Sequence, residues 1–183
     1  MLWLSLALAA PPSIAPSATE KSSLDAGEVV VRAKVDEGGS DALGLVVVKT
    51  TAQKLWTAIL DIDARVNDSS DLKAAVIYDR PSRWDFAVRY TVSILGWGGD
   101  FHIRYHWAET ENWCTYALDP AQENILLSAE GSYRVDPYGD GQLLTYHTRN
   151  KTKIYTPEWV QKRIAASSMG SLLDRLRKRA EAL

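Results

Sequence analysis

The chain has 183 residues, of which 46% are hydrophobic and 24% are charged, and its formal net charge is −2 at pH 7. This length and composition are typical of one soluble globular domain with a substantial core, and they argue against disorder. A net charge so close to zero provides no overall field that would attract nucleic acid, so we expect no nucleic-acid partner.

The first twenty residues differ from the rest of the chain. The apolar run over residues 2–10 is too short to span a bilayer as a helix, and residues 7–9 have the small-x-small pattern that signal peptidases accept. No basic residue precedes Lys21, which is atypical of a signal peptide. We expect residues 1–20 to form a signal peptide or an uncleaved N-terminal anchor, plus a linker, unless the start codon is misassigned. The protein is then exported to the periplasm or the extracellular space, or is tethered to a membrane.

Two strands are predicted next, over residues 28–35 and 45–49, with turn-forming residues between them. Thr50 and Gln53 then match the capping-box pattern, which predicts a helix that ends near Asp61. The apolar face of this helix consists of Leu55, Trp56, Ile59 and Leu60.

Residues 62–70 predict a second short helix or an irregular turn, and a meander of six strands follows. Apolar and polar residues alternate clearly over 84–94 and again over 101–107, as in strands that bury one face. Residues 139–141 (Gly-Asp-Gly) predict a hairpin turn. The expected strands cover residues 73–78, 84–94, 101–107, 113–118, 125–135 and 142–153.

A helix is predicted over residues 156–182, because Thr156 and Pro157 match an N-cap and a first helical position. Its length would be roughly 40 Å. Most side chains over residues 165–171 are small, so this part of the helix either lets rings of the sheet approach closely or leaves unfilled space. The basic run 175–179 is expected to be a solvated face that complements the helix dipole.

The sequence lacks the motifs of several common catalytic, nucleotide-binding and metal-binding sites. It contains no nucleophile elbow, phosphate-binding loop, dinucleotide fingerprint or zinc motif, so we expect no catalytic residue, no cofactor and no metal. The acidic residues over 61–71 do not have the spacing of an EF-hand loop. Cys114 is the single cysteine, and its place within a strand favours a buried small hydrophobic residue over a nucleophile.

Whether the histidines face solvent or the interior depends on the register of their strands. His102 and His106 lie roughly 13 Å apart on one strand face, too far to share a metal. With the aromatic residues facing inward, both histidines and Arg104 face solvent, whereas the reverse register places them inside. Tyr146 and His147 cannot both point inward in a regular strand.

The order of elements, together with three motifs, resembles the helix-grip superfamily, which includes START-type lipid-transfer domains, the birch-pollen-allergen group, polyketide cyclase/dehydratase-like proteins and coenzyme Q-binding proteins. The motifs are residues 49–56 leading to Leu60 and Asp61, residues 131–135 before the 139–141 turn, and residues 143–146. The resemblance implies an α+β fold over residues 28–181. In it a curved antiparallel sheet wraps around a long C-terminal helix, with two short helices after the first strands.

The resemblance also implies an apolar cavity between the sheet and the long helix, which would hold a lipid, sterol, quinone or polyketide-like molecule. The ligand-binding residues are then expected to be Phe86, Val88, Tyr90, Phe101, Ile103, Tyr105, Tyr116, Tyr133, Tyr146, Met169, Leu172, Leu173 and Leu176. Alternate turns of a meander share one end of the sheet, so a cavity rim is expected at Trp97, Pro120, Tyr155 and Trp159. Trp97 either makes transient contact with a membrane or folds back over the sheet.

The leading hypothesis is a non-catalytic carrier of a hydrophobic small molecule. The second is a cyclase/dehydratase-like enzyme, which needs a titratable pair inside the cavity, such as Arg89 or His147 with Tyr90 or Tyr146. The third is a packed module that binds a partner protein through an exposed apolar patch.

Overall fold

The computed structural model describes residues 10–36, 39–68, 71–94, 97–153 and 158–183, without the side chains of residues 36, 68, 94, 97 and 158–168. The expected signal peptide or anchor therefore lies mostly outside the described residues, because the description begins at Ala10. None of the helices within these ranges is long and apolar enough to cross a membrane.

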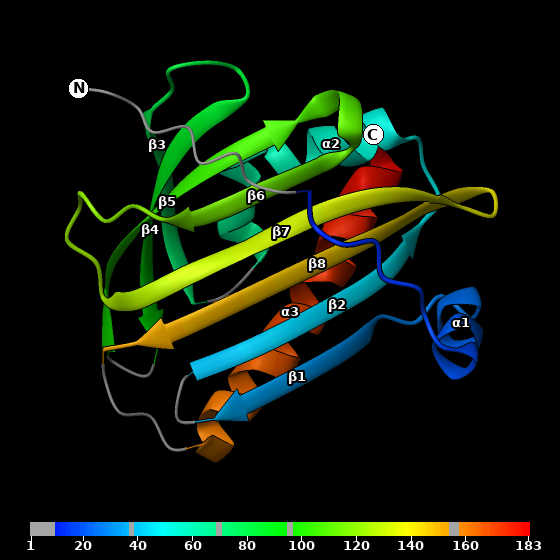
Figure 1. Cartoon of the computed structure of the whole chain (residues 1–183), viewed down its shortest axis with the longest axis horizontal. Helices are drawn as coiled ribbons and strands as arrows, with labels where there is room; N and C mark the ends of the chain where they lie inside the picture. Colours follow the sequence, from blue (N-terminus) through cyan, green and yellow to red (C-terminus); the bar gives the residue numbers. More distant parts are fainter. Residues whose placement is uncertain (1–9, 37–38, 69–70, 95–96, 154–157) are drawn as a thin grey trace.

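The architecture is α+β, as expected: a curved eight-stranded antiparallel sheet is wrapped around a long C-terminal helix (Figure 1). The strand order is β1-β2-β8-β7-β6-β5-β4-β3, so the first hairpin joins the last strand of the meander. The strands are β1 (Val30–Asp36), β2 (Gly39–Val48), β3 (Leu72–Asp79), β4 (Asp85–Ile94), β5 (Trp97–Ala108), β6 (Trp113–Leu118), β7 (Leu126–Tyr138) and β8 (Gly141–Thr152). The helices are α1 (Ala18–Asp25), α2 (Ala52–Leu60) and α3 (Glu158–Ala182), with short 3-10 helices η1 (Asp63–Asp68) and η2 (Glu109–Glu111).

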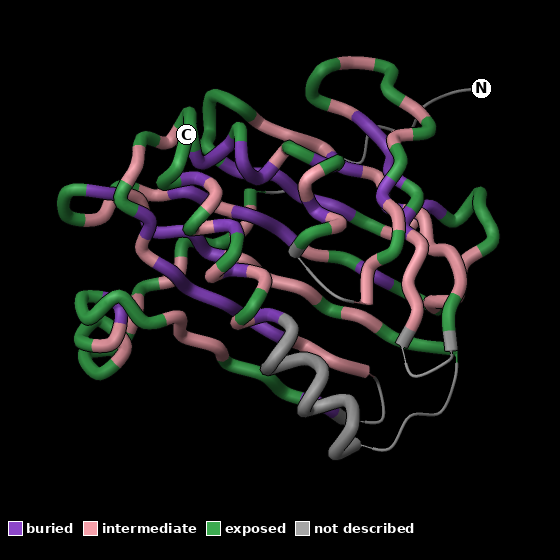
Figure 2. Tube along the Cα trace, turned by 180° about the vertical axis from the view of Figure 1, so that it is seen from behind, coloured by how far each residue is buried: buried purple, intermediate pink, exposed green. Residues whose placement is uncertain are grey.

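Helix α3 lies on the inner face of the sheet, against β1, β2 and α2. Its buried residues Met169, Leu173, Leu176 and Ala180 form one stripe, and Figure 2 shows this buried stretch beside the buried segments of the strands. A Cβ atom at Gly44 of β2 would overlap Leu173 Cδ1 and approach Met169 Sδ to 2.9 Å. A glycine in the sheet therefore permits the close approach of the helix at this point.

The predicted element boundaries differ from the structure in several places. The N-cap of α2 is Thr51, whose side chain accepts a hydrogen bond from the Lys54 amide, and not Thr50. Strand β2 begins at Gly39, inside the expected turn, because Gly39 pairs with β1 and residues 40–44 pair with both β1 and β8. Strand β5 begins at Trp97, before the expected residue 101, because Trp97 and Gly98 pair with the end of β4. Trp84, expected on the buried face, precedes β4 and is 43% exposed.

Helix α1 was not predicted, and it replaces part of the expected linker. Ser17 and Glu20 form a capping box at its start. Leu24, its only buried residue, packs with Leu45 and Leu143 on the outer face of the sheet. Because only one residue of the helix is buried, the helix has no hydrophobic periodicity that the sequence could reveal.

The basic run at the end of α3 is less solvated than expected. Arg175 donates to the Asn67 carbonyl, Arg177 to the Gly27 carbonyl and Arg179 to the Ala58 carbonyl. Arg179 therefore satisfies a carbonyl in the last turn of α2, while Arg175 connects α3 to η1. These arginines join elements that lie far apart in the sequence.

Leu24→Ala should lower the free energy of unfolding by roughly 2 kcal/mol or more, because it empties the small core beneath α1. Urea denaturation followed by circular dichroism measures the loss. Lys21→Ala, on the exposed side of the same helix, is the matched control and should change stability little. Equal stabilities for the two variants would mean that α1 does not pack on the sheet in solution.

Candidate functional site

The strand register brings the predicted rings together on the inner face of the sheet. Phe86 of β4 pairs with Tyr105 of β5, and Tyr105 pairs in turn with Tyr116 of β6. Tyr133 of β7 is opposite Tyr146 of β8, with ring centroids 4.5 Å apart. These cross-strand contacts form a continuous aromatic layer that faces η1 and the helices.

The predicted ligand-binding residues differ in burial. The buried ones are Phe86, Val88, Tyr90, Ile103, Tyr105, Tyr116, Tyr133, Met169, Leu173 and Leu176. Phe101 and Tyr146 are partly buried and pack against this core, and Leu172 is also only partly buried. Leu172 lies beside the buried stripe of α3 rather than within it.

The predicted rim can be placed only in part. The Ile125 amide donates to the Asp100 carbonyl and the Lys153 amide donates to the Ile125 carbonyl, so the start of β5, the segment between β6 and β7 and the end of β8 share one end of the sheet. Pro120 is exposed there. Tyr155 and the side chains of Trp97 and Trp159 lie outside the described residues.

Arg65 of η1 lies at the centre of the aromatic layer, although it was not among the predicted site residues. Its Nη1 atom is 3.2 Å from the Tyr90 hydroxyl, 3.1 Å from that of Tyr105 and 3.3 Å from that of Tyr133. Its Nη2 atom donates to the Ile59 carbonyl at 2.8 Å. The residue is only 8% exposed. The aromatic layer therefore surrounds a cation.

No carboxylate among the described residues neutralises this cation, and the buried Nε atom of Arg65 has no partner there. Burial disfavours the charged guanidinium, but the nearby tyrosine oxygens favour it, so the pKa of Arg65 lies well above its ordinary value. A buried charge without a counter-ion is costly unless hydrogen bonds compensate it. Among the described residues the site therefore has a positive charge without a carboxylate partner, and the Nε–H group of Arg65 has no acceptor there.

The tyrosines around Arg65 are neutral phenols. Burial raises the pKa of Tyr105, Tyr116 and Tyr133 well above the ordinary value, although the charge of Arg65 lowers those of Tyr105 and Tyr133. The hydroxyls of Tyr90 and Tyr105 are 2.9 Å apart, and those of Tyr116 and Tyr146 are 3.0 Å apart. A phenol can donate and accept at once, so the layer is a connected hydrogen-bond network.

Gly131 of β7 makes room for the ring of Tyr116. A Cβ atom at this position would overlap the ring and hydroxyl of Tyr116 and the carbonyl oxygen of His147. The glycine lets Tyr116 lie across β7 and reach Tyr146 on β8. The motif at residues 131–135 therefore has a packing role inside the site.

The sequence contained one indication of the buried arginine. Five tyrosines were expected to face inward, and buried tyrosine hydroxyls need hydrogen-bond partners. Arg65 lies between Ile62, which is buried, and Val66, which packs against the core. Nothing in the sequence showed that η1 would turn this side chain toward the sheet.

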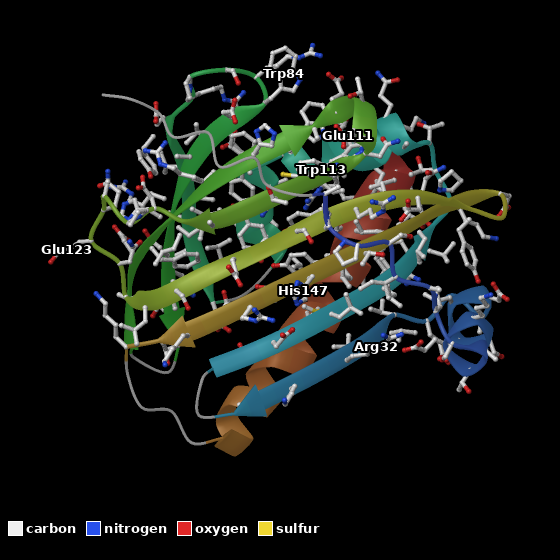
Figure 3. All side chains as sticks on the ribbon, viewed as in Figure 1. Arg32, Trp84, Glu111, Trp113, Glu123 and His147 are labelled. Atoms are coloured by element: carbon white, nitrogen blue, oxygen red, sulfur yellow. The ribbon has the colours of Figure 1, made fainter. Side chains whose placement is uncertain are left out.

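The remaining titratable candidates lie on the outer face. His102 contacts Asn124 and the Glu123 carbonyl, His106 contacts Asp85, and His147 contacts Asp41 at 2.8 Å. Figure 3 shows His147 on the face of the sheet opposite α3. Arg104 and Arg89 also pair with outer-face carboxylates. The solvent-facing register is confirmed, and the pairings that would have put Arg89 or His147 beside an inward tyrosine are wrong.

Within the described ranges no cluster of histidine, cysteine and acidic side chains has the geometry to hold a metal ion. Cys114 is buried, and burial raises the pKa of its thiol to about 12. It is therefore a neutral thiol within the core, consistent with the expected small hydrophobic role.

No family model matches the sequence, and no curated protein matches it. Solved structures share its fold. A STAR-related lipid transfer protein from Xanthomonas axonopodis is 19% identical, with 83% of this chain and 93% of that chain covered and a TM-score of 0.65. Human STARD10 is 13% identical over 91% of this chain and 80% of its own, with a TM-score of 0.68. The Zhui aromatase/cyclase from Streptomyces sp. R1128 is 15% identical over 83% and 94%, with a TM-score of 0.64.

These likenesses confirm the helix-grip fold of the START-type and aromatase/cyclase proteins. At such low identity they establish the fold alone, because one fold supports many functions.

Gly131→Ala should lower the free energy of unfolding by roughly 1–3 kcal/mol, because the added methyl group displaces the Tyr116 ring. Urea denaturation gives the stability, and near-ultraviolet circular dichroism reports the tyrosine packing. Gly170→Ala is the matched control, since nothing lies within 4 Å of its Cβ position, and it should be neutral or stabilise α3. An unperturbed Gly131→Ala protein would contradict the described position of Tyr116.

Cys114 should resist thiol reagents in the native protein, because its thiol is buried and un-ionised. Ellman's reagent in mildly alkaline buffer tests this, with the urea-unfolded chain as the reference for one thiol. Rapid native reaction, at a rate independent of unfolding, would show that the thiol is accessible.

Proposed function

We propose that this protein binds an amphipathic small molecule, whose apolar body lies between the sheet and α3 and whose anionic or acceptor-rich group contacts Arg65. The observation that carries the proposal is the buried guanidinium of Arg65, which has three phenol oxygens around it and no carboxylate among the described residues. Structural neighbours named as lipid-transfer proteins support a hydrophobic ligand.

The chemistry of the layer favours a ligand with an acceptor group. A guanidinium has five N–H donors and no acceptor, and the tyrosine hydroxyls bring further donors. A carboxylate, a phosphate or a polarised carbonyl would accept these hydrogen bonds and offset the positive charge. This chemistry disfavours an entirely apolar ligand, because such a ligand would offer no acceptor to the Arg65 guanidinium.

The apolar surroundings suit the rest of such a ligand. Phe101, Leu118, Leu126 and Tyr146 are only partly buried and pack against the buried core. Phe101, Leu118 and Leu126 lie toward the end of the sheet where the start of β5, the segment between β6 and β7 and the end of β8 meet. Covering such surfaces with a ligand would supply hydrophobic free energy. We infer that the molecule enters from this end, with its polar group leading toward Arg65.

A non-catalytic carrier fits better than an enzyme. All three histidines contact groups of the outer face, so they supply no base next to the aromatic layer. A second candidate is a cyclase/dehydratase-like enzyme, because Arg65 and the neutral phenols could stabilise a developing enolate. The aromatase/cyclase neighbour favours this candidate. A bound ligand that is recovered with unchanged mass after long incubation supports the carrier, and a changed mass supports the enzyme.

Binding of cis-parinaric acid and of its methyl ester, followed by fluorescence, tests the role of Arg65. The wild type should prefer the acid, because only the carboxylate pairs with the guanidinium. Arg65→Met should weaken binding of the acid roughly tenfold or more and that of the ester little, as expected for loss of a charge-assisted hydrogen bond.

Arg89→Met removes an exposed arginine from the outer face and is the matched control for net charge. Arg65→Lys keeps the charge and should bind the acid with intermediate affinity. If Arg65→Met does not fold, Arg65→Lys still tests the contact, because it alters the hydrogen bonds while keeping the charge. A wild type that binds acid and ester equally, or an Arg65→Met protein that keeps the preference, would refute the proposed contact.

A further inference from the structure

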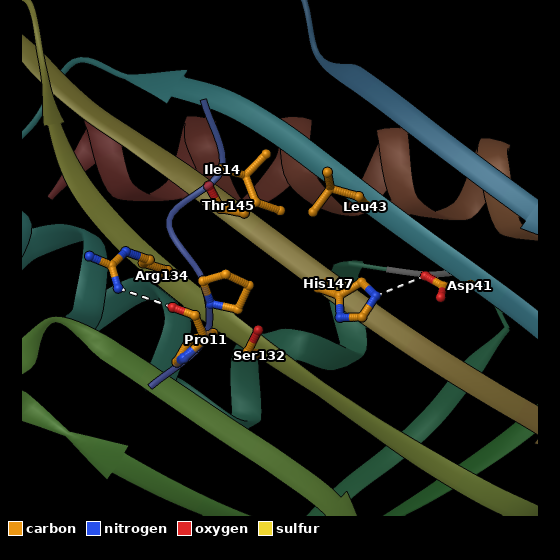
Figure 4. Close-up of a pocket in the computed structure, with 9 residues that line it drawn as sticks. Pro11, Ile14, Asp41, Leu43, Ser132, Arg134, Thr145 and His147 are labelled. Atoms are coloured by element: carbon orange, nitrogen blue, oxygen red, sulfur yellow. Dashed lines mark hydrogen bonds and ion pairs between the residues drawn. The ribbon is translucent and has the colours of Figure 1, made fainter. Parts of the chain in front are cut away.

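The outer face of the sheet has a pocket of its own beneath the N-terminal strap, residues 10–17. Its volume is about 320 Å³, which lies at the small end of the range for small-molecule sites. It lies on the opposite side of the sheet from α3 (Figure 4). The lining residues are Pro11, Pro12, Ile14, Asp41, Leu43, Ser132, Arg134, Thr145 and His147.

The strap forms one wall of this pocket. Arg134 donates to the Pro11 carbonyl at 3.1 Å, and Ile14 lies beside Thr145 and Leu43. The prolines, Ile14 and Leu43 make most of the wall apolar. A molecule held there would be enclosed between the strap and strands β2, β7 and β8.

One polar group inside the pocket lacks a partner. Thr145 is 4% exposed, and its Oγ1 atom has no hydrogen-bond partner among the described residues. A buried hydroxyl without a partner costs free energy that a ligand could recover. The Nε2 atom of His147 is bonded to Asp41. When that nitrogen carries the proton, Nδ1 is left as an acceptor.

The charges around the pocket are already paired. Arg134 contacts Asp136 at 2.9 Å, and Asp41 contacts both His147 and Arg149. An ionic ligand would therefore find no uncompensated partner and would have to be desolvated. This distinguishes the pocket from the inner site, where the cation Arg65 has no carboxylate partner among the described residues.

We propose that this outer pocket binds a small, uncharged, mainly apolar molecule that carries a hydroxyl group. The apolar part contacts Ile14, Leu43 and the strap prolines, and the hydroxyl bonds to Thr145 Oγ1. The proposal is independent of the function proposed for the inner face, because the two sites are on opposite sides of the sheet and use different residues.

Cyclohexanol is a suitable probe, with methylcyclohexane and cyclohexanecarboxylate as comparisons that lack the hydroxyl or carry a charge. Titration of the full chain, labelled at its methyl groups for NMR, should shift Ile14, Leu43 and Thr145 saturably with cyclohexanol. The two comparison molecules should bind more weakly.

Thr145→Val replaces the unpaired hydroxyl with a methyl group of similar shape, so it should fold and weaken cyclohexanol binding roughly two- to tenfold. Thr115→Val is the matched control. Thr115 is also on the outer face, is 6% exposed and has an unpartnered Oγ1 atom, but it does not line the pocket. Ile14→Ala alters only the strap wall and should weaken binding without affecting the sheet.

Four outcomes would overturn the proposal. They are the absence of saturable shifts at the pocket methyl groups, equal affinity in Thr145→Val and Thr115→Val, tighter binding of the carboxylate, and shifts confined to inner-face residues such as Leu173. The last outcome would assign the probe to the inner site and leave the function proposed for that site unaffected.

Discussion

A guanidinium enclosed by protein requires oxygen atoms to replace the water that it loses. Around Arg65 these oxygens come from Tyr90, Tyr105 and Tyr133, on β4, β5 and β7. The three hydroxyls can meet one nitrogen atom only if the sheet curves and η1 is directed toward its inner face. The curvature of the sheet, the position of η1 and the register of the strands are therefore linked by one buried charge.

Two glycines control how closely groups approach this centre. Gly44 lets α3 contact β2 through Leu173 and Met169, while Gly131 lets the Tyr116 ring cross β7. The inner face is consequently dense beneath the C-terminal half of α3 and polar beneath η1. This differs from the uniformly apolar cavity that the resemblance implied, and it explains why we propose an amphipathic ligand.

The two faces of the sheet differ in chemistry although they share the same strands. Tyr133 and Tyr146 point inward, whereas their sequence neighbours Arg134 and His147 point outward and pair with carboxylates. The alternation of a strand produces this separation directly. Helix α1 and the strap cover part of the outer face, so a second set of buried groups, including Thr145, lies there without contact with the inner layer.

The sequence by itself predicted the order of the elements, while its resemblance to the helix-grip superfamily implied the α+β class and favoured the inward direction of the rings. The element order follows from local periodicity, which the strand over residues 84–94 shows most clearly. The predicted sheet-side residues were thus placed on the inner face. By contrast, α1 was missed because Leu24 is its one buried residue, and a single apolar residue has no period.

Only the tertiary structure decided what lies at the centre of the site and which parts of the inner face are closed. Arg65 lies within η1, in a segment predicted only as a short helix or an irregular turn, and its tyrosine partners are 25, 40 and 68 residues away. Strand pairing and the direction of η1 bring these groups together, and no local sequence pattern predicts either of these features. The outer pocket depends in the same way on residues 10–17 returning across strands that are more than a hundred residues distant in the chain.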